Sequence, residues 1–105
     1  MSTLQDIKPK KVTVNINGTK KELKFDLNAY AEIEDKLCTP IPNAFALLES
    51  GSMKAMRAFL WGGLLHQDKN LKIEEIGKLE SFEGIMDVIS EAIEVSMPKD
   101  EENEQ

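Results

Sequence analysis

The stretch MKAMRAFLWGGLLHQDKNLKIEEIGKL, residues 53–79, decides the fold of this chain. It reads as an almost wholly apolar helix, a short polar loop and a second helix. Large apolar side chains occur on nearly every face of the segment from Met53 to Leu65, and one neighbouring element cannot cover them all. This helix is therefore either the central core element of the domain or, in part, a docking surface for another chain.

Two consecutive glycines, Gly62 and Gly63, lie inside this apolar helix. Together they cost roughly 2 kcal/mol of helix stability relative to two alanines, so something should compensate. We expect the compensation to be close helix-on-helix packing. The alternative is a ligand that approaches the backbone at this point.

A β-hairpin is predicted before the helices. Val12, Val14 and Ile16 alternate with polar residues, and Asn17-Gly18 supplies a turn that accepts positive φ. The chain should return as a second strand from Lys20 to Phe25, with Leu23 and Phe25 on one face. Two strands alone are marginally stable in water, so their apolar face must pack on helices.

The remaining pattern is helical. Asp26 should cap a helix from Leu27 to about Leu37, and Ser52 should cap the apolar helix, which runs to about His66. In the first of these helices the apolar stripe is expected to comprise Leu27, Tyr30, Ile33 and Leu37. Thr39 to Pro42 should end that helix, because proline disfavours helix in the residue before it. The other helices are expected at Asn43–Glu49, at about Ile73–Leu79 and from Phe82 to about Met97.

The predicted fold class is therefore α+β, mainly α, with an N-terminal β-hairpin followed by about five helices in a small bundle. The chain has 105 residues, of which 41% are hydrophobic, and this suits a single globular domain over residues 11–97. Residues 1–10 should be a flexible N-terminal segment. Residues 98–105, PKDEENEQ, should be an acidic disordered tail.

Composition argues against several classes of partner. The net charge is -6, the sequence pI is near 4.8, and the 13 basic residues are scattered along the chain. Nucleic acid and anionic membrane surfaces are therefore not expected to bind, because both need a basic patch. No apolar run approaches the ~20 residues of a spanning helix. The lone cysteine, Cys38, fits a reducing compartment, so a cytoplasmic protein is expected.

No residue pattern indicates catalysis or a cofactor. His66, the only histidine, sits near a predicted helix end with no nucleophile or orienting acid close in sequence. Cys38 reads as a small apolar filler. Asp68 cannot begin an EF-hand calcium-binding loop. The fifth, sixth and twelfth positions of that loop would be Lys72, Ile73 and Leu79, where a calcium site needs an oxygen ligand, a glycine and a glutamate. The glycines match no phosphate-binding motif, and we predict a protein that is not an enzyme and has no cofactor or metal.

The order of these segments resembles the tail assembly chaperones of long-tailed bacteriophages and prophages, especially those of Gram-positive hosts. The resemblance spans roughly Val12 to Met97, and its most specific parts are FDLNA (Phe25–Ala29) and RAFLWGGLLH (Arg57–His66). The family often has a small residue such as threonine where this chain has Lys72, so the cap of the following helix departs from the pattern.

This resemblance implies a non-enzymatic role in building a phage tail. Members of the family are thought to coat the tape measure protein before the tail tube polymerises around it. The tape measure protein and the tail tube protein are thus the implied partners, with self-association as a further possibility. The implied location is the host cytoplasm, with the protein absent from the mature virion, and many members also have a longer frameshifted form. The alternative function is a small adaptor or regulatory domain that binds a peptide helix and has no connection to phage.

We predict that a partner or a second copy contacts the apolar helix around Met53, Met56, Trp61 and Leu65. Methionine side chains suit such adaptable contacts. The competing interpretation is that all four residues belong to the core. Tyr30 and Phe45 are weaker candidates, with the same competing interpretation.

Overall fold

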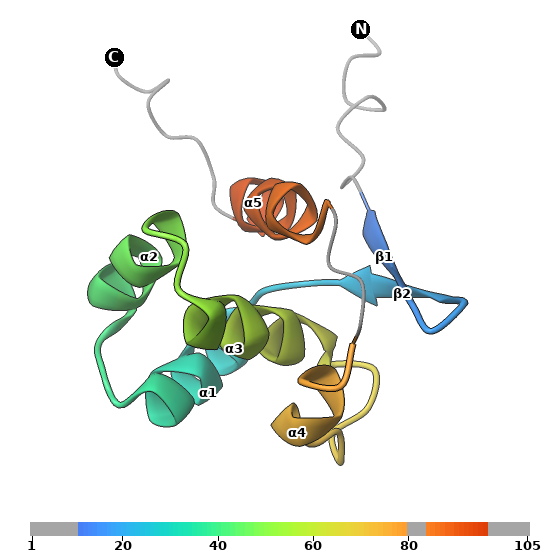
Figure 1. Ribbon diagram of the computed structural model, residues 1–105, viewed down its shortest axis with the longest axis horizontal. Coiled ribbons are helices and arrows are strands. Elements are labelled where there is room, and N and C mark those ends of the chain that lie inside the picture. Colours follow the sequence, from blue (N-terminus) through green and yellow to red (C-terminus); the bar gives the residue numbers. More distant parts are fainter. Residues whose placement is uncertain (1–10, 80–83, 97–105) are drawn as a thin grey trace, which may run out of the picture.

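The computed structural model describes residues 11–79 and 84–96, and it has the predicted α+β, mainly α fold (Figure 1). A two-stranded antiparallel hairpin is followed by five helices, which together form one small globule. The bounds are β1 Val12–Ile16, β2 Thr19–Leu23, α1 Leu27–Leu37, α2 Ile41–Glu49, α3 Met53–Leu64, α4 Ile73–Ile76 and α5 Ile85–Ser96. The predictions for residues 1–10 and 98–105, and the helix ends at Phe82 and Met97, lie outside the described residues.

The hairpin forms as predicted. Asn17 and Gly18 both have positive φ, 52° and 84°, which is the conformation of a two-residue type I′ turn. Val12, Val14 and Ile16 are buried, whereas Thr13 and Asn15 between them are exposed. β2 ends at Leu23, two residues earlier than expected, although Phe25 is still buried beyond the strand.

Two helix caps are confirmed. The Asp26 carboxylate accepts a hydrogen bond from the Ala29 N–H at 2.9 Å, and the Ser52 hydroxyl accepts one from the Ala55 N–H at 3.1 Å. Each satisfies one of the N–H groups that the first turn of a helix leaves free. α1 ends at Leu37, as predicted, because Cys38 adopts the left-handed conformation.

Three helix boundaries differ from the prediction. α2 begins at Ile41 instead of Asn43, because Pro42 lies in its first turn, where a missing N–H costs nothing. α3 ends at Leu64 instead of His66, where the Gly63 carbonyl accepts a hydrogen bond from the Lys24 N–H at 2.9 Å. α4 is a single turn that ends at Ile76, with no side-chain cap at Lys72.

Leu27 was assigned wrongly to the apolar stripe of α1, since its side chain is 84% exposed. Of the other predicted residues, Ile33 is buried and Tyr30 and Leu37 are partly buried against the core, and Ala29, which was not predicted, is buried as well. Leu27 is the first helical residue, and the direction in which the chain enters α1 turns its side chain to solvent. Helical spacing alone does not fix which residues of the first turn are buried.

α3 is the central core element of the domain. It contacts α1, α2, α4, α5 and β2, and every residue from Ala58 to Leu64 is buried (Figure 1). Phe59 and Leu64 are among the largest side chains that are fully buried. The core-element interpretation therefore accounts for most of the apolar residues of α3.

The two glycines of α3 mark its closest contacts. A Cβ at Gly62 would lie 2.7 Å from Cγ1 of Ile33 on α1, and a Cβ at Gly63 would lie 2.6 Å from Cδ1 of Leu23 on β2. Real Cβ atoms do not approach other carbons so closely. The predicted helix-on-helix packing is thus confirmed at Gly62, whereas Gly63 packs against the hairpin, which was not predicted.

We expect Gly62→Ala to destabilise the protein although alanine is the better helix former. Ile33 is completely buried, so overpacking of about 1 to 3 kcal/mol should exceed the gain of up to about 1 kcal/mol in helix propensity. Urea unfolding should therefore give a net loss of about 1 to 2 kcal/mol.

The matched control is Gly77→Ala, because its Cβ would meet Arg57 Cδ at 3.4 Å, an ordinary contact. A double-mutant cycle with Ile33→Ala completes the test, since that variant removes the atoms that crowd position 62. If Gly62→Ala costs as much in the Ile33→Ala background as in the wild type, the close contact is not the cause.

Candidate functional site

The four predicted contact residues fall into two pairs on two different hollows. Met53 and Met56 lie on a hollow of about 440 Å³ between α3, α4 and the start of α5. We call this hollow the α3–α4 groove; its lining is Met53, Lys54, Met56, Arg57, Leu60, Ile76, Gly77, Leu79 and Ile85. Trp61 and Leu65 line a second hollow of about 430 Å³, between α1 and α3.

Trp61 belongs to the core. Its side chain is 5% exposed, and its indole N–H donates a hydrogen bond to the Leu71 carbonyl at 2.9 Å. The Lys36 ammonium lies 5.2 Å from the centre of the indole ring, within cation–π range. Trp61 therefore joins α3 to the loop before α4 and offers only an edge to any partner.

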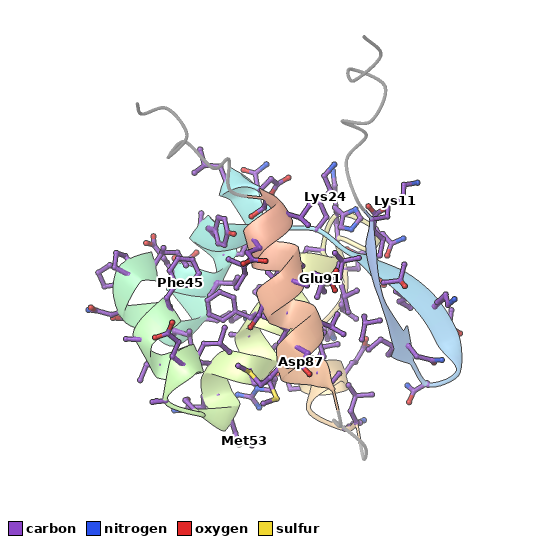
Figure 2. All side chains as sticks on the ribbon, turned by 90° about the horizontal axis from the view of Figure 1, so that it is seen from above. Lys11, Lys24, Phe45, Met53, Asp87 and Glu91 are labelled. Carbon is purple, nitrogen blue, oxygen red and sulfur yellow. The ribbon has the colours of Figure 1, made fainter. Side chains whose placement is uncertain are left out.

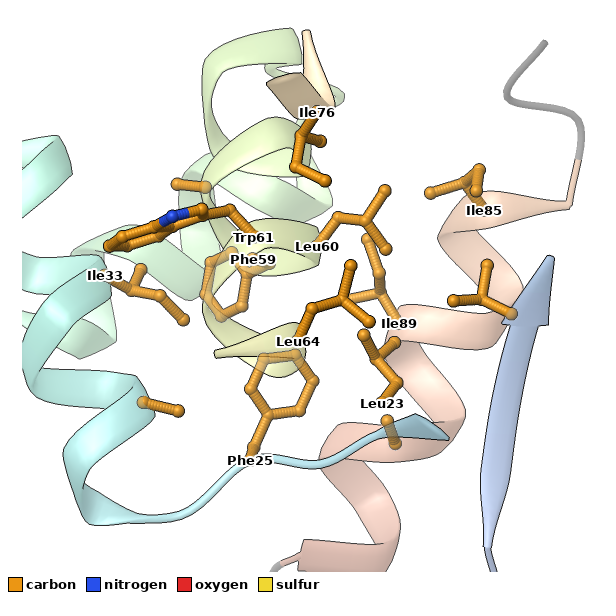
Figure 3. Packing of buried hydrophobic residues seen from close by; sticks show 14 of the residues in the cluster. Leu23, Phe25, Ile33, Phe59, Leu60, Trp61, Leu64, Ile76, Ile85 and Ile89 are labelled. Carbon is orange, nitrogen blue, oxygen red and sulfur yellow. The ribbon is translucent and has the colours of Figure 1, made fainter. Parts of the chain in front are cut away.

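The α3–α4 groove has an apolar floor and a methionine at its rim. Leu60, Ile76 and Ile85 come from three different helices and converge on the groove (Figure 3), and each is at most 5% exposed. Met53 is 61% exposed at the first turn of α3 (Figure 2). Because the exposed thioether continues the apolar floor, this face offers hydrophobic surface that residues 11–79 and 84–96 leave uncovered.

Two cationic side chains, Lys54 and Arg57, also line the groove. The Nε of Arg57 is buried and has no hydrogen-bond partner within the described part of the chain. The aliphatic part of the Arg57 side chain lies beside Gly77. A Cβ atom at position 77 would be 3.4 Å from Arg57 Cδ. Within the described residues, the buried Nε donor lacks an acceptor, which costs folding free energy.

Tyr30 and Phe45, the weaker candidates, are half-buried members of an aromatic cluster. Tyr30 stacks on Phe25 with ring centres 5.6 Å apart and meets Phe45 edge-on at 5.9 Å. Phe59 completes the cluster, 6.0 Å from Phe25 and 5.6 Å from Phe45. The cluster joins α1, α2, α3 and the segment between β2 and α1, which gives both candidate residues a structural role.

Burial raises the pKa of the Tyr30 hydroxyl above its ordinary value of 10.0. The hydrogen bond with Ser96, 2.8 Å between the two hydroxyl oxygens, acts in the opposite direction, and the negative charge of Asp26 adds to the rise. This hydrogen bond ties α1 to the last turn of α5.

His66 and Gln67 have a role that the sequence did not indicate. The His66 Nε2 lies 3.0 Å from the Glu22 carbonyl oxygen, and the Glu22 N–H donates to the Gln67 side-chain oxygen at 3.1 Å. Both residues thus occupy the outer edge of β2 in place of a third strand. No signal local to either residue could predict contacts across more than 40 positions of sequence.

Cys38 is exposed, and its thiol donates only to the Asp35 carbonyl, at 3.7 Å. Residues 11–79 and 84–96 contain no group of three His, Cys, Asp or Glu side chains that could hold a metal ion. Within the same residues, every helix is too short or too polar to cross a membrane.

Comparisons with protein-family models, with curated proteins and with solved structures find no match for this chain.

Trp61→Ala and Met53→Ala should separate the core from the exposed surface of α3. Trp61→Ala should cost about 3 to 5 kcal/mol of unfolding free energy, because it empties a buried site and orphans the Leu71 carbonyl. Met53→Ala should change stability by less than about 0.5 kcal/mol, as for other exposed positions. Chemical denaturation of both variants gives the comparison, and equal losses would contradict it.

Tyr30→Phe should lose about 0.5 to 1.5 kcal/mol at neutral pH, since it removes the hydrogen bond to Ser96. Because folding raises the pKa of Tyr30, its neutral form stabilises the protein below pH 10, and this contribution is lost as the pH rises through the raised value. The wild type should therefore lose more stability above pH 10 than Tyr30→Phe does. Parallel alkaline titrations of the two melting temperatures test this, and Tyr30→Phe losing as much as the wild type would contradict it.

Proposed function

We propose that this chain is a non-enzymatic phage tail assembly chaperone and that its α3–α4 groove binds the tape measure protein. The resemblance of FDLNA and RAFLWGGLLH to that family suggests the role. The groove is the observation that carries the proposal, because it is an apolar hollow bordered by an exposed methionine and two cationic side chains.

An amphipathic helix is the partner that such a groove fits. Grooves between helices take the apolar face of a partner helix through residues spaced three and four apart, and methionine adapts to different side chains. A chaperone of a long helical protein must bind many similar segments and release them when tube subunits arrive. Modest contacts repeated along one target suit that task better than a single tight interface.

Arg57 adds a charge preference to the groove. The cationic groups of Arg57 and of the neighbouring Lys54 favour a partner helix that carries an acidic residue beside its apolar stripe.

The alternative function, an adaptor or regulatory domain unrelated to phage, would use the same groove for another helical peptide. Gene order separates the two. A tail chaperone gene is expected between a tail tube gene and a very long gene for a coiled-coil-rich protein.

Co-expression with the tape measure protein should give a complex whose affinity depends on the residues that line the groove. Met53→Glu places a carboxylate on the docking surface and should weaken capture of the tape measure protein about tenfold or more. Arg57→Met should also weaken capture, while the unfolding free energy of the free chaperone stays constant or rises by about 1 kcal/mol, because the orphaned donor is gone.

Leu27→Glu is the matched control, since Leu27 is also exposed and apolar but does not line the groove. It should leave capture unchanged. No capture by the folded wild type, with both proteins in solution, would count against the chaperone role. Equal losses for Leu27→Glu and Met53→Glu would remove the groove as the binding site.

A further inference from the structure

We propose that β1 is a pairing edge for a second copy of this chain, so that two hairpins join about a two-fold axis into one four-stranded antiparallel sheet. This inference concerns the hairpin alone and does not depend on the proposed chaperone function. Figure 1 shows the hairpin turn projecting from the helices at one end of the molecule.

The two edges of the hairpin differ. Along the outer edge of β2, the Glu22 N–H and carbonyl are paired with Gln67 and His66. The next outward N–H, that of Lys24, donates to the Gly63 carbonyl at 2.9 Å. These groups occupy the outward positions of Glu22 and Lys24, so only Lys20, next to the turn, keeps outward backbone groups without a partner among the described residues.

The β1 edge is open. In the two-residue hairpin, Val12, Val14 and Ile16 bond to β2, so the backbone N–H and carbonyl groups of Thr13 and Asn15 point away from it. Within residues 11–79 and 84–96, these outward groups have no hydrogen-bond partner. A hollow of about 750 Å³ opens beside this edge, between β1 and the beginning of α5.

The charge pattern of the hairpin also points to β1. Natural proteins protect free sheet edges with charged residues, above all lysine. β1, VTVNI, has no charged residue, whereas β2 contains Lys20, Lys21 and Glu22. The charged residues thus lie on β2, whose outer edge is largely occupied, whereas β1 is neutral.

The β1 strand is complementary to itself. An antiparallel pair centred on Val14 places Thr13 opposite Asn15 of the second copy, and Asn15 opposite its Thr13. These are the residues whose backbone groups face outward, so each pair can exchange two hydrogen bonds. All five residues of β1 are then paired, the neutral Thr and Asn side chains share one face, and no charges meet within the paired strands.

The test uses the full chain and two oppositely charged variants, T13K/N15K and T13E/N15E. Sedimentation of the wild type should show a monomer–dimer equilibrium. The dimerisation affinity of each variant alone should be lower than that of the wild type by about tenfold or more, because like charges face each other across the two-fold axis. An equimolar mixture of the two variants should recover dimers, since every cross-strand pair is then of opposite charge.

Asn43→Lys/Ser50→Lys is the control, since it adds the same charge as T13K/N15K at one exposed position in α2 and one just after it, and it should dimerise like the wild type. Hydrogen exchange adds a direct readout, because the Thr13 and Asn15 amides should be protected in the wild-type dimer and not in T13K/N15K. A wild type that stays monomeric at its solubility limit would overturn the proposal. So would dimers that persist in both charged variants, or a dimer whose Thr13 and Asn15 amides exchange freely.

Discussion

The architecture depends on the closeness with which α3 approaches its neighbours at Gly62 and Gly63. Without Cβ atoms at these two positions, the backbone of α3 meets Ile33 on one side and Leu23 on the other. Consecutive positions of a helix point about 100° apart, so the pair opens two contact directions at once. The hairpin and α1 are thereby held against the same helical turn, and Lys24 adds a backbone hydrogen bond to Gly63.

The fold could be predicted from the sequence wherever a residue acts on its own backbone. Asn17-Gly18 has few conformations other than a tight turn, and Asp26 and Ser52 bond to amides only three residues away. The mistakes occur where tertiary contacts decide. Leu27 has helical spacing but faces water, and α3 stops at Leu64, where Lys24, just after β2, donates a hydrogen bond to the Gly63 carbonyl.

The candidate surface was predictable only in part. Composition indicates that α3 has too many apolar residues for one neighbour, yet it cannot say which of them remain uncovered. The structure buries Trp61, leaves Met53 exposed and assigns Trp61 and Leu65 to a different hollow from the two methionines. The orphaned Arg57 nitrogen depends on the spatial arrangement of α3 and α4, which no local pattern contains.

His66 and Gln67 bond to the Glu22 backbone on the outer edge of β2, and this limits how many strands can be added to the sheet. A sheet with two open borders can add strands indefinitely and so form fibrils. In the proposed dimer, the β1 edges of two molecules pair with each other, so neither edge remains free. The outer edges of the four-stranded sheet are then occupied at Glu22 and Lys24, so association through the hairpin would end at a dimer.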